Sequence, residues 1–414
     1  MKNHKKLLLS IVIMTASGFL LTSQTNSSQN DFRPQMPEPM STKTAMEYFR
    51  DEGIKIGINL GNTLDAVDFW TNPNQPIAIE TVWGNPRANQ AIFNGYKEQG
   101  FDIVRIPVTW NGHIGSAPDY IIEQAWLRRV AEVVGYARNA GLKAFINIHH
   151  DGNTFEDETP GWLLINRANI DPSITDKFEK VWKQIAEYFI NYGDWLMFQG
   201  FNEIHNGSWG QGTPQEHAII NDWNQKFTNA VRSTGGNNAR RYLLYYGYFG
   251  EISISSPSSP FKLPIDTVNG RQIVCFHYYD PADFAMQATT PNWGTRQEKT
   301  AIDTIFRAFK RKFIDRNIPV IIGENGPFRY VNWSGNPGYS EANAVTARQS
   351  RLNYIDYFYS KAGENRIIPF FWEMGSYTDG ATLHGDAVLF NRNTGKPNSD
   401  ESAEVIQHMI NAIK

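Results

Sequence analysis

Cysteine is almost absent from this chain. Cys275 is the only one among 414 residues, so no disulfide can form within the chain and stability must come from a packed core. Hydrophobic residues make up 41% of the sequence, which is enough for a large core. The formal net charge is only −3, and this balance argues against a nucleic-acid-binding surface.

Long hydrophobic runs are also scarce, and the notable one lies at the N-terminus. Lys2, Lys5 and Lys6 precede an apolar stretch over residues 7–21, and a polar segment follows it. This order is typical of a secretory signal peptide. A transmembrane anchor is the alternative, but the stretch is short for a membrane span and small polar residues interrupt it.

We therefore expect residues 1–28 to be a signal peptide of the Sec type with its leader, and residues 29–41 to be a short polar, proline-rich segment. No cysteine lies near the expected cleavage site, which excludes lipid attachment there. The predicted mature protein is bacterial, either secreted or periplasmic, and keeps no stable membrane anchor after cleavage.

Eight short apolar runs, bounded by turn-forming residues, predict buried parallel strands. They are Ile54–Leu60, Ile103–Thr109, Lys143–Ile148, Leu196–Phe201, Tyr242–Tyr248, Ile273–His277, Val320–Gly323 and Ile367–Trp372. Amphipathic stretches between most of them predict helices. These are Glu123–Asn139, Asp176–Ile190, Gln215–Ser233, Lys299–Ile314 and Glu341–Lys361. The connection after Tyr248 is rich in serine and proline and lacks a clear helical pattern.

This alternation predicts an α/β protein, a (β/α)₈ barrel in one domain over residues 42–414. An open, doubly wound sheet is the alternative. Its glycine-rich phosphate turn is missing after the first strand, where the sequence reads Gly61-Asn62-Thr63. The chain exceeds the usual barrel length of about 250 residues, so we expect long loops at the C-terminal rim. Residues 278–297 and 325–339 are the candidates.

Two glutamates stand where predicted strands end. Glu203 follows the fourth strand and Glu324 follows the seventh. An isolated buried charge is costly, so these carboxylates are unlike ordinary core residues. In a barrel both strand ends share one rim, where enzymes of this fold place their chemistry. Paired carboxylates at one site are the equipment of glycosidic bond hydrolysis.

Other polar and aromatic side chains also gather at the predicted strand ends, more than a purely structural rim needs. We take these as candidate substrate-binding residues: Asn62, Asp65, Arg105, His149, His150, Asn202, His277, Tyr279 and Trp372. Asn62 and Asp65 have an alternative role in a turn, since both residue types favour loops.

Several of these motifs together resemble glycoside hydrolase family 5. They are Val104-Arg105-Ile106-Pro107, His149-His150, Asn202-Glu203, His277-x-Tyr279 and Gly323-Glu324, in that order. The segments 57–65 and 80–86 resemble the endoglucanase and xyloglucanase branch of that family. The resemblance spans about residues 57–375, essentially the whole predicted barrel.

The resemblance implies a retaining mechanism with defined roles. Glu324 would be the nucleophile, kept ionised by Arg105, and Glu203 the general acid/base, its pKa raised by the neighbouring negative charge. Tyr279 would hydrogen-bond the nucleophile and His277 would orient the acid/base.

Further implied roles concern the sugar. Asn202 would bind the sugar 2-hydroxyl, Trp372 would form a platform under the sugar at the cleavage point, and His149, His150, Asn62 and Asp65 would contact sugars on the non-reducing side. Two positions depart from the commoner family pattern. Asn325 replaces an aromatic after the nucleophile, and residues 371–375 read Phe-Trp-Glu-Met-Gly.

Four tryptophans lie in loop-like stretches, where aromatic faces suit sugar rings but are also common on ordinary surfaces. They are Trp70, Trp209, Trp293 and Trp333. The segment His149-His150-Asp151 is a possible metal site, but a catalytic zinc needs three protein ligands and an open position, and the motif H-E-x-x-H is absent. We therefore expect neither a metal nor a cofactor.

The sequence thus predicts a secreted, retaining endo-β-1,4-glucanase. Its polysaccharide partner would be cellulose, mixed-linkage glucan or xyloglucan. An endo-β-1,4-mannanase on the same frame is the first alternative, because one changed hydroxyl orientation alters few hydrogen bonds. A glycan-binding protein without catalysis is the second, although such a protein is expected to lose one of the two glutamates.

Overall fold

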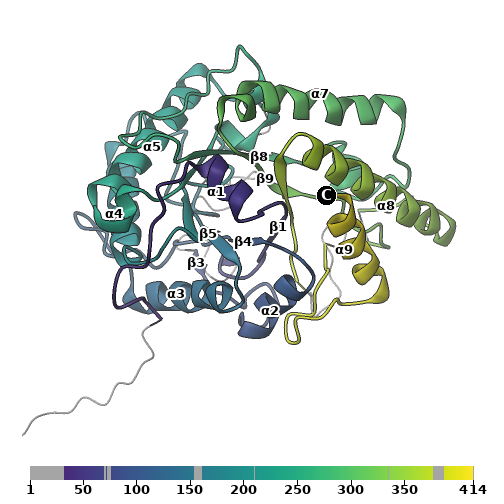
Figure 1. Ribbon diagram of the computed structural model, residues 1–414, viewed down its shortest axis with the longest axis horizontal. Helices are drawn as coiled ribbons and strands as arrows, with labels where there is room; N and C mark the ends of the chain where they lie inside the picture. The colour runs from purple at the N-terminus through teal and green to yellow at the C-terminus, as the bar shows by residue number, and fades with distance from the viewer. Residues whose placement is uncertain are drawn as a thin grey trace, which may run out of the picture. The chain divides into compact units, whose positions relative to one another are not determined.

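The computed structural model describes residues 32–69, 71, 76–152, 161–208, 210–333, 335–375 and 387–413. The predicted signal peptide lies outside this part of the chain. Eight parallel strands close into a barrel in the order β1-β10-β9-β8-β7-β6-β5-β4 (Figure 1). The strands are β1 Gly57–Asn59, β4 Ile103–Ile106, β5 Lys143–Ile146, β6 Leu196–Gln199, β7 Leu243–Tyr246, β8 Gln272–Tyr278, β9 Val320–Asn325 and β10 Ile367–Phe371. The predicted (β/α)₈ barrel is confirmed.

Each barrel strand falls within or overlaps one of the eight predicted apolar runs. Nearly every strand residue is buried, since one face packs inside the barrel and the other against helices. The barrel closes between its first and last strands, where Gly57 pairs with Phe370 on one side and with Ile103 on the other. A Cβ at position 57 would lie 2.2 Å from the Phe370 ring, so glycine leaves room there for an aromatic of the core.

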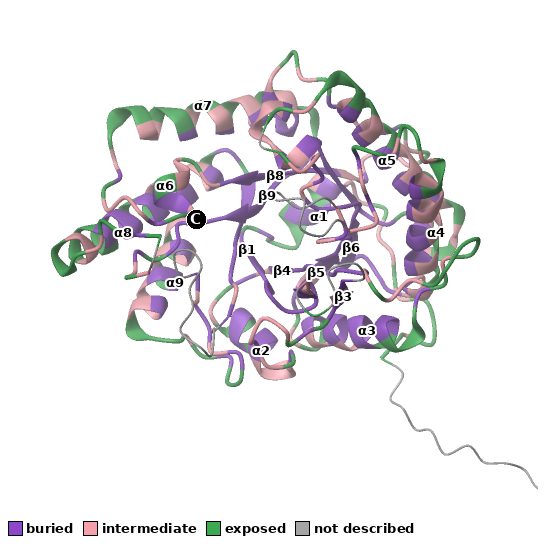
Figure 2. Cartoon of the chain, turned by 180° about the vertical axis from the view of Figure 1, so that it is seen from behind, coloured by how far each residue is buried: buried purple, intermediate pink, exposed green. Residues whose placement is uncertain are grey.

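Helices surround the strands, with buried residues on their inner faces (Figure 2). The longer ones are α2 Gln90–Glu98, α3 Gln124–Asn139, α4 Pro172–Tyr188, α5 Pro214–Ser233, α7 Arg296–Lys312, α8 Glu341–Glu364 and α9 Asp400–Ala412. Capping boxes begin α5 at Thr213 and α7 at Thr295. In such a box the threonine side chain and the glutamate three residues later bind backbone N–H groups that would otherwise lack partners.

A short helix, α1 Ala45–Asp51, covers the end of the barrel at which the strands begin. Its first N–H donates to the carbonyl of Gly270, just before β8. The ring of Tyr48 packs on Tyr242, just before β7. Within the described residues, no helix combines the length and the apolar character that crossing a membrane requires.

The connection between β7 and β8 contains 3₁₀ turns over Tyr248–Gly250 and Ile252–Ser255 and then an irregular segment. An irregular backbone lacks internal partners, and α5 supplies them. The amide of Asn221 bonds the backbone of Pro260 and Lys262, and the amide of Gln225 bonds both backbone groups of Ile265. One face of α5 therefore binds the irregular segment at Pro260, Lys262 and Ile265.

The C-terminal rim carries the expected long loops. The loop after β8 contains only the short helix α6 Ala282–Ala285, and the loop after β9 runs to the start of α8 at Glu341. A small antiparallel pair, β2 Val67–Asp68 with β3 Ile77–Ala78, extends the rim after β1.

Of the tryptophans considered for sugar stacking, Trp293 is buried in the structure. Trp293 is only 7% exposed and packs on Tyr354 with ring centroids 4.9 Å apart. It is a core residue, so a sugar-stacking role for it is wrong. The reason is that its loop folds back onto α8, which turns the ring inward. Trp70 and Trp209 lie outside the described residues.

The ion pair between Arg232 and Asp266 should be a main support of the irregular connection. Arg232 on α5 donates to both oxygens of Asp266, at 2.9 and 2.7 Å, and both side chains are less than 10% exposed. The Arg232→Ala variant leaves a buried carboxylate unpaired, so we expect about 3 kcal/mol less unfolding free energy. Denaturant unfolding measures this, with Lys226→Ala as control, since its pair with Glu179 is exposed and should contribute at most about 1 kcal/mol.

Candidate active site

Arg105 lies at the centre of the polar residues inside the C-terminal end of the barrel. It projects from β4 and is fully buried. Its Nε donates to Oε1 of Gln199 at 3.0 Å, and its Nη2 donates to Oδ1 of Asn202 at 2.6 Å. Its Nη1 donates both to Oδ1 of Asn59 at 3.0 Å and to Oε1 of Glu324 at 2.7 Å. A buried cation is tolerated because four acceptors surround it.

The two predicted carboxylates meet across His277. Its Nδ1 bonds Oε1 of Glu203 and lies 3.7 Å from Oε2 of Glu324. One oxygen from each carboxylate and one nitrogen of His277 all lie within 4.8 Å of one another. The Tyr279 hydroxyl donates to the same oxygen of Glu324, Oε2, at 3.1 Å. Barrel closure thus brings the ends of β6 and β9 to one site.

A local irregularity of β9 aims Glu324 into this site. Along the β8–β9 ladder, Phe276 pairs with Ile322 but His277 pairs with Glu324, so Gly323 is an extra residue. Such bulges bend a strand and redirect side chains, and they are frequent next to active sites. The bulge places Glu324 directly opposite His277 in the β8–β9 ladder.

Burial is the main influence on the protonation of Glu203. It raises the pKa of Glu203 to about 7, against an opposing effect of Arg105. The pKa of Glu203 is raised, as the sequence predicted. The main cause is loss of water around the carboxyl group and not the neighbouring negative charge. Burial also lowers the pKa of His277 to about 3, so its ring is neutral near pH 7.

Trp372 and His149 form an aromatic wall beside the carboxylates. Trp372 follows β10, and its ring stacks on that of His149 with an angle of 4° between the planes. The His149 Nδ1 is 3.1 Å from the amide nitrogen of Asn147, which holds the imidazole in place. His150 packs edge-on against His149.

Asn62 and Asp65 lie in one tight turn after β1. The buried Asp65 carboxylate accepts hydrogen bonds from the backbone N–H groups of Asn62, at 3.0 Å, and Thr63, at 2.7 Å. Asn62 has a φ of 53°, which asparagine tolerates better than most residues. Both residues therefore have a turn role, the alternative considered from the sequence. Their contact with sugar stays a prediction.

A metal would find ligand atoms on this side of the site. Asp65, His149 and His150 offer atoms within 4.8 Å of one another. Asp151, named with the two histidines in the sequence, does something else. Its carboxylate accepts hydrogen bonds from the backbone N–H of Trp110 and from Nε1 of Trp162. Both Asp65 oxygens already serve the turn, so a metal would compete with the fold for them.

Four residues of the site were not among the sequence candidates. Asn59 and Gln199 bind Arg105, Asn147 bonds both Gln199 and His149, and the Tyr246 hydroxyl bonds Nε2 of His277. A usable signal exists for the first three, because each is a polar residue inside an otherwise apolar strand run. Tyr246 gives no such signal, since tyrosine is common in strands.

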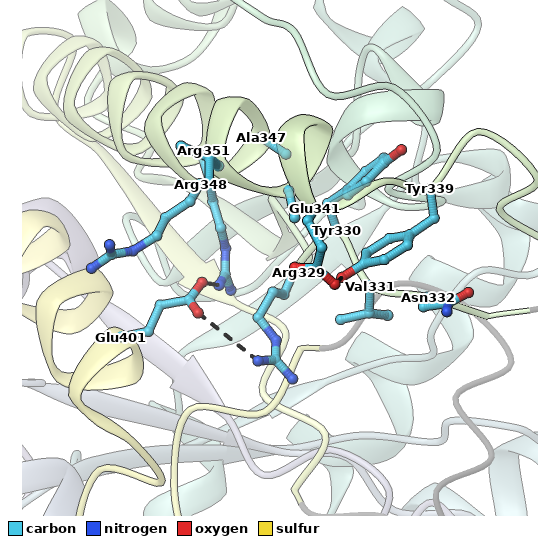
Figure 3. A pocket seen from close by; sticks show the side chains of 12 residues that line it. Arg329, Tyr330, Val331, Asn332, Tyr339, Glu341, Ala347, Arg348, Arg351 and Glu401 are labelled. Atoms are coloured by element: carbon cyan, nitrogen blue, oxygen red, sulfur yellow. Dashed lines mark hydrogen bonds and ion pairs between the residues drawn. The ribbon is translucent and has the colours of Figure 1, made fainter.

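A separate pocket of about 300 Å³ lies between the loop after β9, the start of α8 and the start of α9 (Figure 3). Arg329 and Arg351 both point toward Glu401, at 3.9 and 3.4 Å. None of the predicted site residues lines this pocket. The Glu401 carboxylate in this pocket is therefore paired with two arginines, unlike the two carboxylates that face each other across His277.

Comparison with known proteins agrees with this geometry. The family model for cellulase (glycosyl hydrolase family 5) matches residues 64–378. The xyloglucan-specific endo-β-1,4-glucanase BoGH5A of Bacteroides ovatus is 34% identical over 86% of this chain and 69% of its own. Endoglucanase A of Paenibacillus barcinonensis is 33% identical over 90% of both chains.

Among solved structures, a GH5-4 broad specificity endoglucanase from Bacteroides salanitronis superposes with a TM-score of 0.75. It is 38% identical, over 87% of this chain and 93% of its own. The family model covers the barrel from the turn after β1 to the end of β10, and so includes both glutamates. The chain therefore belongs to glycosyl hydrolase family 5, the cellulase family, and is a glycoside hydrolase.

Proposed function

We propose that this chain is a retaining endo-β-1,4-glucanase that cuts internal β-1,4 bonds of glucan chains by double displacement. The observation that carries the proposal is the pairing of Glu203 and Glu324 across His277, with the closest oxygens within 4.8 Å. Retaining enzymes hold their carboxyl groups about 5–5.5 Å apart, whereas inverting enzymes leave room for a water between them. The short separation here favours the retaining route.

The two carboxylates have environments suited to different roles. Arg105 and Tyr279 both donate to Glu324, which stabilises a carboxylate that attacks the anomeric carbon. Burial raises the pKa of Glu203 to about 7, which keeps a proton available for the leaving glycosidic oxygen. In the second step, ionised Glu203 accepts a proton from water, and that water releases the sugar from Glu324.

The surrounding residues suit a sugar at the cleavage point. Arg105 fixes the Asn202 side-chain oxygen at 2.6 Å, so the amide N–H₂ of Asn202 is the group left to meet a sugar hydroxyl. The stacked wall of Trp372 and His149 offers a flat face for sugar C–H groups. These roles remain part of the proposal.

The substrate is proposed from two sources. Relatives that match most of this chain bear the names endoglucanase and xyloglucan-specific endoglucanase, and the long rim loops fit an open cleft that binds the middle of a polymer. A mannanase on the same frame is the alternative. Export through the N-terminal segment, to the periplasm or beyond, belongs to the same proposal because polymeric glucans lie outside the cell.

The nucleophile assignment has a chemical test. We expect Glu324→Ala to lose at least about 10³-fold in kcat on an aryl β-cellobioside. Added azide should restore turnover and give the α-glycosyl azide, because azide then attacks directly from the face that Glu324 left. Glu203→Ala should instead give the β-azide. A β-azide from the Glu324 variant would mean that Glu324 is the acid/base and Glu203 the nucleophile.

The pH dependence should follow from Glu203. The acid must be protonated in the first step, and its pKa is about 7. The value of kcat/KM on β-glucan should therefore decline above about pH 7, approaching a tenfold loss per further unit. Replacing the sugar leaving group by dinitrophenolate, which needs no proton, should remove this alkaline decline. An alkaline limb that persists on that substrate would assign it to another group.

Substrate preference is measured by initial rates on carboxymethylcellulose, lichenan, xyloglucan and mannan side by side. We expect at least one of the three glucans to exceed mannan by about tenfold or more. Viscosity should fall well before much reducing sugar appears. A higher rate on mannan supports the alternative, and early release of one small sugar at nearly constant viscosity contradicts endo action.

A further inference from the structure

The Tyr246 side chain contacts His277 at Nε2, the ring nitrogen opposite the one that binds Glu203. It ends β7, is 1% exposed, and places its hydroxyl 2.5 Å from Nε2 of His277. The opposite nitrogen of the same ring, Nδ1, bonds Oε1 of Glu203. A single imidazole therefore joins a buried hydroxyl to the carboxyl group proposed as the acid/base.

The backbone is shaped to allow this contact. A Cβ at position 323 would lie 2.2 Å from the Tyr246 hydroxyl oxygen and 3.1 Å from Nε2 of His277. Any side chain there would push the two groups apart. Gly323, the extra residue of the β9 bulge, therefore leaves the space that the hydroxyl occupies.

The protonation states fix the direction of both hydrogen bonds. Burial raises the pKa of Tyr246 well above its ordinary value, so the hydroxyl keeps its proton and can donate. Neutral imidazole has one donor nitrogen and one acceptor nitrogen. An ionised carboxylate only accepts, so Nδ1 must carry the hydrogen whenever Glu203 is charged, and Nε2 must then accept from Tyr246.

We propose that Tyr246 is a positioning residue that holds His277 in the tautomer with hydrogen on Nδ1. This inference rests on the function proposed above. Because Nδ1–H donates to Oε1 of Glu203, that oxygen serves as an acceptor in both protonation states. The acidic proton of Glu203 is thereby directed to Oε2, the oxygen left to meet the glycosidic bond.

The tautomer matters in both steps of the reaction. In the first step the Oε2 proton passes to the glycosidic oxygen as the C–O bond breaks and Glu324 bonds to the anomeric carbon. In the second step, Oε2 takes a proton from the attacking water. With the other tautomer, Nδ1 would accept the Glu203 proton in a hydrogen bond and hold it away from the substrate.

Loss of the Tyr246 hydroxyl should therefore weaken acid catalysis selectively. For Tyr246→Phe we expect kcat/KM on β-glucan to fall about tenfold, the size of one hydrogen bond in a buried network. The kcat/KM for dinitrophenyl β-cellobioside reports only the first step, and its leaving group needs no proton. This kcat/KM should therefore change less than about twofold.

The alkaline limb on β-glucan should move to higher pH. A hydrogen bond donated to a carboxylate favours its charged form, so weakening that bond raises the pKa of Glu203. Arg105, Glu324 and Tyr279, the other ionisable groups around this carboxyl, are unchanged in the variant.

Tyr245→Phe is the matched control. Tyr245 is the preceding residue of β7 and is also fully buried, but its hydroxyl bonds Thr228 at 2.9 Å, away from the carboxylates. The control removes the same atom from the same strand, so it measures the cost in stability alone. Both substrates should respond to it equally.

The tautomer itself is observed by ¹⁵N NMR of the imidazole, with the His277 signals identified by their loss in His277→Asn. Wild type should show hydrogen on Nδ1 and a bare Nε2, and Tyr246→Phe should show a mixture. Hydrogen on Nε2 in wild type would overturn the proposal, as would equal loss on both substrates in Tyr246→Phe. A wild type that cleaves neither substrate refutes the proposed function instead, while the NMR result still judges the hydrogen bond.

Discussion

One buried guanidinium organises this molecule's chemistry. Arg105 on β4 binds four side chains from three other strand ends: Asn59 of β1, Gln199 of β6 with Asn202 just after it, and Glu324 of β9. A planar fork of five donors can satisfy such a set, whereas an ammonium cannot present the same geometry. Because an unpaired cation inside the barrel would be very costly, each acceptor must stay in register. The geometry of the carboxylate site and the integrity of the barrel end are therefore one requirement.

Much of the fold follows from short-range patterns. The eight apolar runs sit on the observed strands because a strand buried on both faces has few other compositions available. The bounds differ by a few residues where the predicted runs continue into loops, as at Phe201 beyond β6 and Thr109 beyond β4. The serine- and proline-rich sequence after Tyr248 lacks a helical pattern, and the structure has only 3₁₀ turns and irregular backbone there. Its dependence on Asn221, Gln225 and Arg232 of α5 cannot be seen in any local pattern.

The site divides in the same way. Glu203, Glu324 and Arg105 are visible in the sequence because charges interrupt apolar runs at the ends of strands. Tyr246 is not visible, since only the closed barrel shows that its hydroxyl meets His277. The sugar-stacking role considered for Trp293 is wrong because its loop-like sequence does not reveal that the loop folds inward onto α8. The cause of the Glu203 pKa shift also needed the structure, because burial depends on everything packed around a group.

The bulge at Gly323 couples two distant positions of the chain. A Cβ at position 323 would lie 2.2 Å from the Tyr246 hydroxyl, so position 323 can gain a side chain only if residue 246 moves or becomes smaller. Sequence drift at position 323 is therefore conditional on residue 246. Residues 246 and 323 should therefore be randomised together in mutant libraries of this enzyme. A library that varies only position 323 would mostly contain side chains that collide with the Tyr246 hydroxyl.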